Sequence, residues 1–221
     1  LMGLGLREME VIADPAMFCS AYSPEIPDIS SEKLLIGLNL AGDRPEQRFP
    51  KGHEDSKITY LARNLRDYLD HHGGGKVVYF PHCSKYDLRY EEVLREVLEQ
   101  KFFSISQIEG MFPENAASVP LLAGLYSQMN VVIGMRGHSN IIPYGQNVPT
   151  IGLGNHVKNQ FFAKETGMSS TDFSLVNLER QLDQYVQNLA LKREMSYNRN
   201  RFYDYNDDFN EKVVSILWQT G

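Results

Sequence analysis

The chain has 221 residues, 23% charged and 42% hydrophobic, which is typical of a soluble globular protein and excludes global disorder. Its net charge of -6 argues against nonspecific nucleic-acid binding, because that mode needs a basic surface to neutralise phosphates. Cys19 and Cys83 lie far apart and form no CxxC motif, so we expect neither a disulfide framework nor a metal knuckle. No apolar run approaches the roughly 20 residues of a membrane span, and we expect a cytoplasmic protein.

The first 31 residues are expected to hold a short strand followed by a linker. Residues 10–15 read as a strand that ends at Asp14-Pro15, a turn signal. Residues 22–31 contain Pro24 and Pro27 among Ser and Asp, which is typical of an irregular connection. Since the sequence does not begin with Met, we expect it to be a piece of a longer protein.

Strands and helices alternate between residues 32 and 174. Apolar runs predict five buried strands, over residues 33–40, 76–80, 102–105, 130–134 and 148–153. Helical spacing of apolar residues predicts helices between them, over residues 58–69, 86–100, 119–129 and 139–144, and a further helix that ends near Gly167. A polar loop is expected over residues 42–52. This alternation predicts an α/β fold, a parallel sheet with helices on both faces.

The C-terminal part, residues 175–221, is expected to be helical. Periodicity predicts helices over residues 175–191 and 207–218. The Arg- and Tyr-rich stretch between them, residues 192–205, is interpreted as a solvated loop.

The most informative segment is residues 131–143, where a buried strand stops at Gly134 and a helix follows. The turn between them carries Arg136, Gly137 and His138. In an open α/β sheet such a turn lies at the carboxyl end of a strand, where ligands bind. A guanidinium there grips a carboxylate or phosphate, and an imidazole moves a proton near neutral pH. The segment therefore predicts an anion site with proton transfer.

Other candidate ligand-binding residues follow neighbouring strands. Lys158 follows the strand at 148–153 and is expected to converge with Arg136 on one anion, helped by helix N-termini near Ser139 and His156. Asn155 belongs to the same loop as Lys158 and is a candidate contact. His82 follows the strand at 76–80 and is a candidate for the same cleft.

Each candidate also has a structural alternative. Arg136 would tie a loop to a carboxylate, and His138 would cap the helix or pack beneath it. Lys158 would be a solvated side chain, His82 an incidental loop residue and Asn155 a helix cap.

Several motifs in fixed order resemble one known family. An apolar strand ends in Gly-Met-Arg-x-His at residues 133–138, a Pro-bearing strand follows at 148–152, and Lys158 precedes the aromatic pair at 161–162 and Thr-Gly-Met at 166–168. Earlier elements, residues 78–82 followed by Asp87 and residues 11–16 with Asp14, agree in order and spacing. Both aspartates are interpreted as turn or cap residues. Over residues 10–170 the chain resembles the C-terminal domain of the polysaccharide pyruvyl transferases.

The resemblance implies a two-lobed architecture similar to the GT-B glycosyltransferases, of which this chain supplies mainly the C-terminal lobe. Residues 1–31 would then be a strand and linker from the N-terminal lobe, residues 32–174 a Rossmann-like donor-binding domain, and residues 175–221 C-terminal helices. The N-terminal lobe, which should help to hold the acceptor, is mostly absent, so activity of the isolated chain is not implied.

The activity that the resemblance implies is transfer of a pyruvyl group from phosphoenolpyruvate to sugar hydroxyls, which forms a cyclic ketal. The acceptor would be a glycan or a lipid-linked sugar of exopolysaccharide or cell-wall synthesis, which would bring the protein to a membrane surface. Arg136 and His138 would be catalytic, and Arg136, Lys158, His82, Asn155, Gly134 and Gly137 would bind substrate. No metal and no cofactor besides the donor substrate is expected.

The sequence departs from the family at two places. Gly137 stands where members usually carry a bulky aliphatic residue. An arginine often follows the strand at 36–40 closely, whereas the nearest here is Arg44.

Two other functions stay open. A GT-B-like glycosyltransferase would use the same strand ends for a sugar nucleotide, although Gly73-Gly74-Gly75 precedes a strand and no Gly-rich phosphate loop precedes a helix. A noncatalytic domain would bind only an acidic sugar, another anion or a partner.

Overall fold

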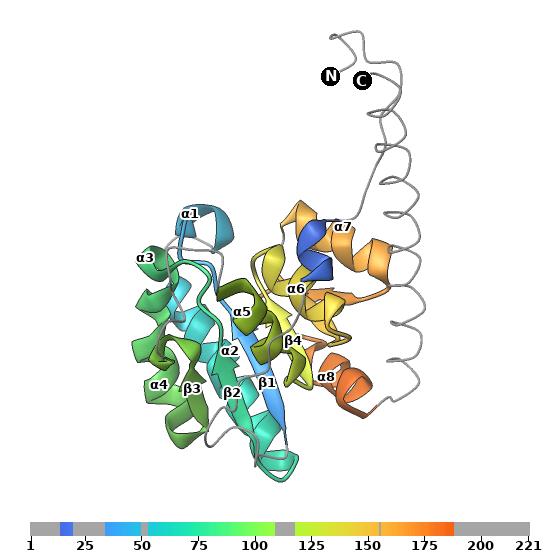
Figure 1. Cartoon of the computed structure of the whole chain (residues 1–221). Helices are drawn as coiled ribbons and strands as arrows, with labels where there is room; N and C mark the ends of the chain where they lie inside the picture. The colour runs from blue at the N-terminus through green and yellow to red at the C-terminus, as the bar shows by residue number, and fades with distance from the viewer. Residues whose placement is uncertain (1–13, 20–33, 50–52, 109–117, 155, 188–221) are drawn as a thin grey trace, which may run out of the picture.

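The computed structural model describes residues 14–19, 34–49, 53–108, 118–154 and 156–187. These residues form a six-stranded sheet with all strands parallel, in the order β3-β2-β1-β4-β5-β6 (Figure 1). The strands are β1 (Leu35–Asn39), β2 (Lys76–Tyr79), β3 (Phe102–Ser104), β4 (Val131–Gly134), β5 (Thr150–Leu153) and β6 (Ser169–Thr171).

Eight α-helices accompany the sheet within the described residues. They are α1 (Pro45–Arg48), α2 (Glu54–His71), α3 (Ser84–Asp87), α4 (Glu91–Leu98), α5 (Ser118–Ser127), α6 (His138–Gly145), α7 (Val157–Thr166) and α8 (Leu178–Gln187). Short 3₁₀ helices are η2 (Pro15–Phe18), η3 (Leu88–Tyr90), η4 (Glu99–Lys101) and η5 (Ile105–Gln107).

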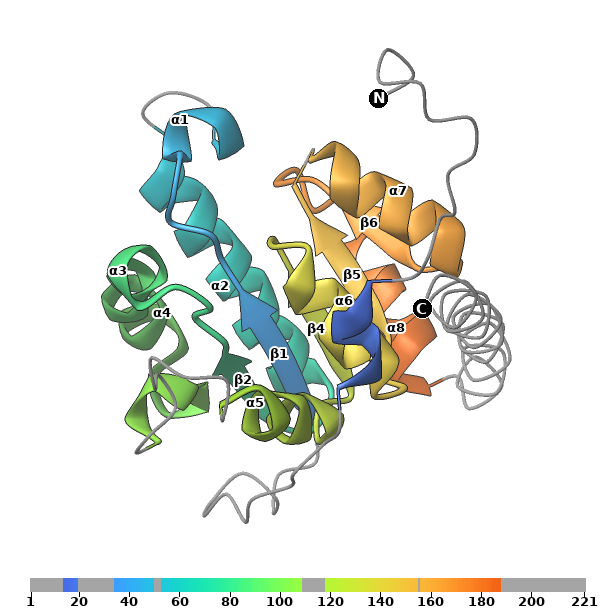
Figure 2. The same cartoon turned by 45° about the horizontal axis from the view of Figure 1, so that its top comes forward.

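The sheet is covered on both faces, as the alternation of elements predicts. Helices α2 and α5 lie on opposite sides of β1 (Figures 1 and 2). Leu61 of α2 belongs to a cluster with Ile36 and Leu38, whereas Tyr126 of α5 belongs to a second cluster with Val78. Every residue of β1 is buried, which explains its nearly continuous apolar sequence. The expected α/β Rossmann-like fold is therefore confirmed.

Several expected boundaries were wrong. The polar loop at 42–52 contains α1, and the helix expected over 86–100 is divided into α3, η3 and α4. The break comes directly after Asp87, whose carboxylate is held by buried contacts described below. Strand β6 was missed because Ser-Ser-Thr is only partly buried and has no apolar signal.

Expectations for the chain ends are tested only in part. Asp14 caps η2 through its carboxylate, so it is a cap as expected, while residues 10–13 lie outside the described part. Helix α8 confirms the central part of the helix expected over 175–191, and residues 192–221 lie outside the description. The division of the chain at residues 31 and 174 stays a prediction. Among the described residues, no helix combines the length and apolar character needed to cross a bilayer.

Candidate active site

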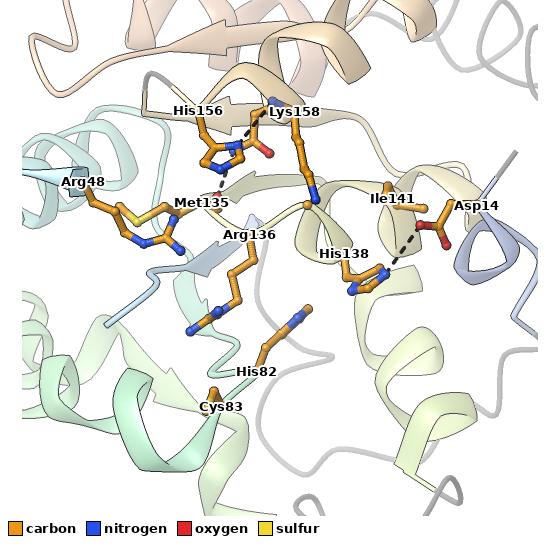
Figure 3. A pocket seen from close by; sticks show the side chains of 12 residues that line it. Asp14, Arg48, His82, Cys83, Met135, Arg136, His138, Ile141, His156 and Lys158 are labelled. Atoms are coloured by element: carbon orange, nitrogen blue, oxygen red, sulfur yellow. Dashed lines mark hydrogen bonds and ion pairs between the residues drawn. The ribbon is translucent and has the colours of Figure 1, made fainter. Parts of the chain in front are cut away.

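The strand order reverses between β1 and β4, so the connections leaving these strands diverge and open a crevice at their carboxyl ends. A cavity of about 520 Å³ lies at this place (Figure 3). Its lining residues are Asp14, Arg48, His82, Cys83, Met135, Arg136, Gly137, His138, Ile141, His156, Lys158 and Asn159.

Most of the site residues expected from the sequence surround this one cavity. Arg136, Gly137 and His138 come from the turn after β4, Lys158 from the first turn of α7, and His82 from the loop after β2. The structure thus brings together five residues from three separate segments.

One expected site residue is not part of this wall. Gly134 does not line the cavity, and a Cβ built on it would lie 2.6 Å from Ser139 Oγ. Its lack of a side chain therefore lets the start of α6 pack closely on β4. Asn155 lies outside the described residues.

Arg136 is held by a buried carboxylate. Its Nε and Nη2 donate to Asp87 Oδ2 and Oδ1 at 2.9 and 2.6 Å, and Asp87 is fully buried. Nη2 also lies 2.7 Å from Asp43 Oδ1. The tie to a carboxylate, the structural alternative for Arg136, is therefore present. Since an arginine has five N–H groups, the two on Nη1 stay without a partner among the described residues.

Asp87 organises three loops rather than one turn. Besides Arg136, it accepts hydrogen bonds from the backbone N–H groups of Gly42, His82 and Cys83 at 3.0, 3.0 and 3.1 Å. These donors belong to the loops after β1 and β2, and Arg136 to the loop after β4. The structural role expected for Asp87 is correct, but the residue is a buried junction and not a cap.

Arg48 and Asp43 extend this network at the cavity wall. Arg48 lines the cavity and donates from Nε to the Asp43 backbone oxygen at 2.8 Å and from Nη2 to the carboxylate at 3.2 Å. Burial alone would raise the pKa of Asp43, but the charges of Arg136 and Arg48 outweigh it and lower that pKa. Burial likewise opposes the charge on Arg136, whose pKa is nevertheless raised by Asp87 and Asp43. Two carboxylates thus pair with the two guanidinium groups.

Lys158, unlike Arg136 and Arg48, is not paired with a carboxylate of the described residues. Its backbone N–H donates to Nδ1 of His156, the N-cap of α7, which confirms the helix start expected there. Its ammonium group forms no ion pair or hydrogen bond with any residue in the described ranges. Figure 3 shows the side chain directed toward the turn that carries Arg136 and His138. Lys158 therefore supplies a positive charge that no carboxylate of the described residues balances.

His138 is the first residue of α6 and remains accessible. Its side chain is 61% exposed, and Nε2 lies 3.6 Å from Asp14 Oδ2. Among the described residues the ring makes no capping hydrogen bond, and its exposure contradicts packing beneath the helix. Within the described part of the chain, the backbone N–H groups of Gly137, His138 and Ser139 have no acceptor. Such a helix start favours a nearby anion.

His82 is anchored at the floor of the cavity. Its ring Nε2 lies 2.7 Å from the hydroxyl of Tyr126, and its backbone N–H binds Asp87. Burial lowers the pKa of His82 to about 4, against the opposing charge of Asp87, and Arg136 and His138 add to the shift. The ring is therefore neutral near pH 7.

Two buried asparagines that the sequence analysis missed hold the strand ends in place. Asn39 donates to the Phe80 backbone oxygen at 2.7 Å and accepts from the Arg136 backbone N–H at 3.0 Å. Asn159 donates to the Met135 backbone oxygen at 2.8 Å. A polar residue at the end of the apolar run 34–40 was the available signal for Asn39.

Arg48 was missed because its segment was expected to be a loop. The nearest arginine after β1, Arg44, caps α1 with its backbone at φ 54° and does not line the cavity. Arg48, one helical turn later in α1, does line the cavity. Helix α1 thus brings an arginine to the cavity although none follows β1 directly.

The family model for polysaccharide pyruvyl transferase matches residues 1–157, about seven tenths of the chain. The chain belongs to the polysaccharide pyruvyl transferase family. A comparison of this pyruvyl transferase domain with curated protein sequences found no match.

Solved structures support the fold. One similar structure is S. aureus MnaA with UDP, which is 12% identical and has a TM-score of 0.55. The match covers 86% of this chain and 50% of the MnaA chain. The UDP-GlcNAc 2-epimerase from Neisseria meningitidis bound to UDP-GlcNAc is 11% identical with a TM-score of 0.57, covering 85% and 45%. The chain thus spans about half of each. The C-terminal domain of the group 1 glycosyl transferase LpcC from Francisella tularensis is 11% identical with a TM-score of 0.54, covering 86% and 95%. These likenesses confirm a GT-B-like lobe and concern the fold alone.

Proposed function

We propose that the cavity binds phosphoenolpyruvate and that this lobe, within the full-length protein, transfers its pyruvyl group to two hydroxyls of a sugar. The observation that carries the proposal is the convergence of Lys158, Arg136 and His138 on one cavity at the switch point. Membership of the pyruvyl transferase family supports the same reaction.

The distribution of positive groups suits a donor with two anionic ends. Phosphoenolpyruvate carries a carboxylate and a phosphate, which need separate cationic or N–H anchors. Lys158 and the start of α6 form one such anchor. The free Nη1 of Arg136, beside Arg48, forms the other. Because both guanidinium groups already pair with carboxylates, Lys158 is expected to contribute most of the unbalanced charge.

The reaction requires two C–O bonds to form at C2 of phosphoenolpyruvate and one to break. A proton is added to C3, so that the methylene becomes a methyl group, and the first sugar hydroxyl attacks C2. The second hydroxyl then displaces phosphate. One of the two hydroxyl protons balances the new C–H bond, and the other leaves with hydrogen phosphate.

His138 is the group proposed to move the proton. Its ring is exposed and Nε2 lies within ion-pair distance of Asp14, which would stabilise the protonated imidazole, whereas the His82 ring is held by Tyr126. General acid or base catalysis of this kind contributes roughly 10²- to 10⁴-fold in rate.

The acceptor is proposed to be a glycan or a lipid-linked sugar of exopolysaccharide or cell-wall synthesis. A lipid-linked acceptor would bring a cytoplasmic protein to the membrane surface. The part of the protein that faces this lobe would contribute to acceptor binding.

Thermal unfolding of the 221-residue chain with different ligands tests the proposal. A ligand at about 100 times its Kd stabilises a protein by about 2.7 kcal/mol. We expect phosphoenolpyruvate to raise the midpoint more than orthophosphate does, and UDP-GlcNAc to have no effect. Stabilisation by UDP-GlcNAc alone would favour a sugar-nucleotide transferase, and stabilisation by none would favour a noncatalytic domain.

Lys158→Ala is the matched variant for this experiment. Its ammonium forms no hydrogen bond or ion pair with the described residues, so we expect unchanged unfolding without ligand and at least tenfold weaker binding of phosphoenolpyruvate. Unchanged binding would contradict the proposed donor site. Arg136→Lys is less suitable, because it also breaks the fork with buried Asp87 and so changes stability as well as binding.

A further inference from the structure

His82 and Tyr126 form a partly buried contact at the wall of the cavity. Tyr126, on α5, is fully buried and stacks on Phe80 with ring centroids 4.0 Å apart and an interplanar angle of 11°. The His82 ring meets Tyr126 edge-on at 5.9 Å, with Nε2 2.7 Å from the hydroxyl. The His82 backbone is tied to Asp87. Both rings are therefore fixed from two directions.

The contact determines where the imidazole proton lies. Burial raises the pKa of Tyr126 well above 10, so the phenol keeps its proton. Among the described residues, His82 Nε2 is the one hydrogen-bond partner of that hydroxyl. If Nε2 were protonated, the buried phenol would have no acceptor for its own hydrogen, an unfavourable state that folded proteins avoid. Nε2 must then accept, and the neutral ring carries its proton on Nδ1.

The Nδ1–H group has no acceptor in the described part of the protein, although His82 lines the cavity. We infer that His82 presents Nδ1–H as a hydrogen-bond donor to an oxygen atom of the bound ligand, and that Tyr126 is the positioning residue that fixes this tautomer. The ligand's oxygen must offer a lone pair to this donor, as a carboxylate or phosphate oxygen does. The two cavity histidines thus have separate roles: His82 donates a hydrogen bond, and His138 exchanges a proton with the reactants.

The tautomer can be tested without turnover, by long-range ¹H–¹⁵N correlation spectra of the chain at pH 7. The chain has six histidines, and the spectrum of His82→Asn identifies the His82 signals. We expect Nδ1 of His82 to be protonated and Nε2 not. Tyr126→Phe keeps the stacking ring and should shift His82 toward the Nε2–H form. Tyr185→Phe, which also removes a buried phenol hydrogen bond, to Ser169 Oγ at 2.6 Å, should not. A protonated Nε2 in the unsubstituted chain, or the same tautomer in Tyr126→Phe, would overturn the inference.

The donor role rests on the proposed function and has its own readout. Asparagine places an N–H near the position of Nδ1, whereas leucine offers none. We expect His82→Leu to weaken phosphoenolpyruvate binding by roughly tenfold and His82→Asn to retain most of it. Equal affinities of the two variants would overturn the donor role. No binding of phosphoenolpyruvate to the unsubstituted chain would overturn the proposed function, and the tautomer would still be decided by the spectra.

Discussion

The loops after β1, β2 and β4 are joined by buried polar contacts, whereas the starts of α6 and α7 carry exposed side chains with few partners. On the first side, Asp87 alone accepts hydrogen bonds from three loops. On the second, His138 is 61% exposed and the Lys158 ammonium has no partner in the described residues. The contrast teaches that the charges that set the geometry are paired around the buried Asp87, while the His138 ring and the Lys158 ammonium, which are proposed to act on the ligand, are less constrained by their neighbours.

The largest expected effect comes from removing Asp87, the buried residue that joins the three loops. Asp87→Ala would leave Arg136 and three backbone N–H groups without their acceptor. Removing one partner of a buried ion pair typically costs about 3–5 kcal/mol, and we expect a loss of that size in urea unfolding with an unchanged m value. Asp87→Asn keeps the shape and should lose less. A loss under about 1 kcal/mol in Asp87→Ala would refute the junction.

On the exposed side, His138→Ala should affect rate and not stability. In the full-length protein we expect transfer to fall by roughly 10²- to 10⁴-fold. The free energy of unfolding should stay within about 0.5 kcal/mol. His53→Ala, at an exposed histidine outside the cavity wall, is the control and should change neither quantity. Retained transfer in His138→Ala would contradict the mechanism.

The pH dependence of stability should reveal the lowered pKa of His82. The pKa of His82 falls from 6.5 to about 4 on folding, so the unfolded chain binds more protons between these values. The contribution of His82 is thus fully present above pH 6.5 and is lost as the pH falls toward 4. We expect the free energy of unfolding, measured in urea between pH 4 and 7, to rise less steeply with pH for His82→Asn than for the unsubstituted chain. Equal slopes would contradict the lowered pKa of His82 in the folded chain.

The smallest effect is expected at Gly137. Its backbone lies at φ -55° and ψ -53°, and no atom lies within 4 Å of an added Cβ. Gly137→Ala should therefore keep stability or raise it by about 0.4–1 kcal/mol, because it restricts the unfolded chain. Gly137→Leu would project into the cavity and should be equally well tolerated in urea unfolding. A loss above about 1 kcal/mol in either variant would show that this turn requires glycine.

The sequence predicted the parts of this molecule that depend on local patterns. Apolar runs located β1 to β5, and the Gly-Met-Arg-x-His motif located the turn that lines the cavity. Strand β6 was missed because it pairs through its backbone and buries little. The partners of Arg136 were missed because Asp43 and Asp87 lie far from it in the chain, and nothing in their local sequence marks a long-range ion pair.

The tie between three loops at Asp87 has a practical consequence for ligand discovery. The cavity wall is already assembled in this lobe, so few side chains need to be ordered when a small anion binds. The affinity for the anion is therefore not reduced by the entropic cost of ordering. Fragments and phosphoenolpyruvate analogues should therefore bind the isolated lobe about as tightly as they bind the same wall in the full-length protein. This chain can therefore serve as a screening reagent for the proposed donor site.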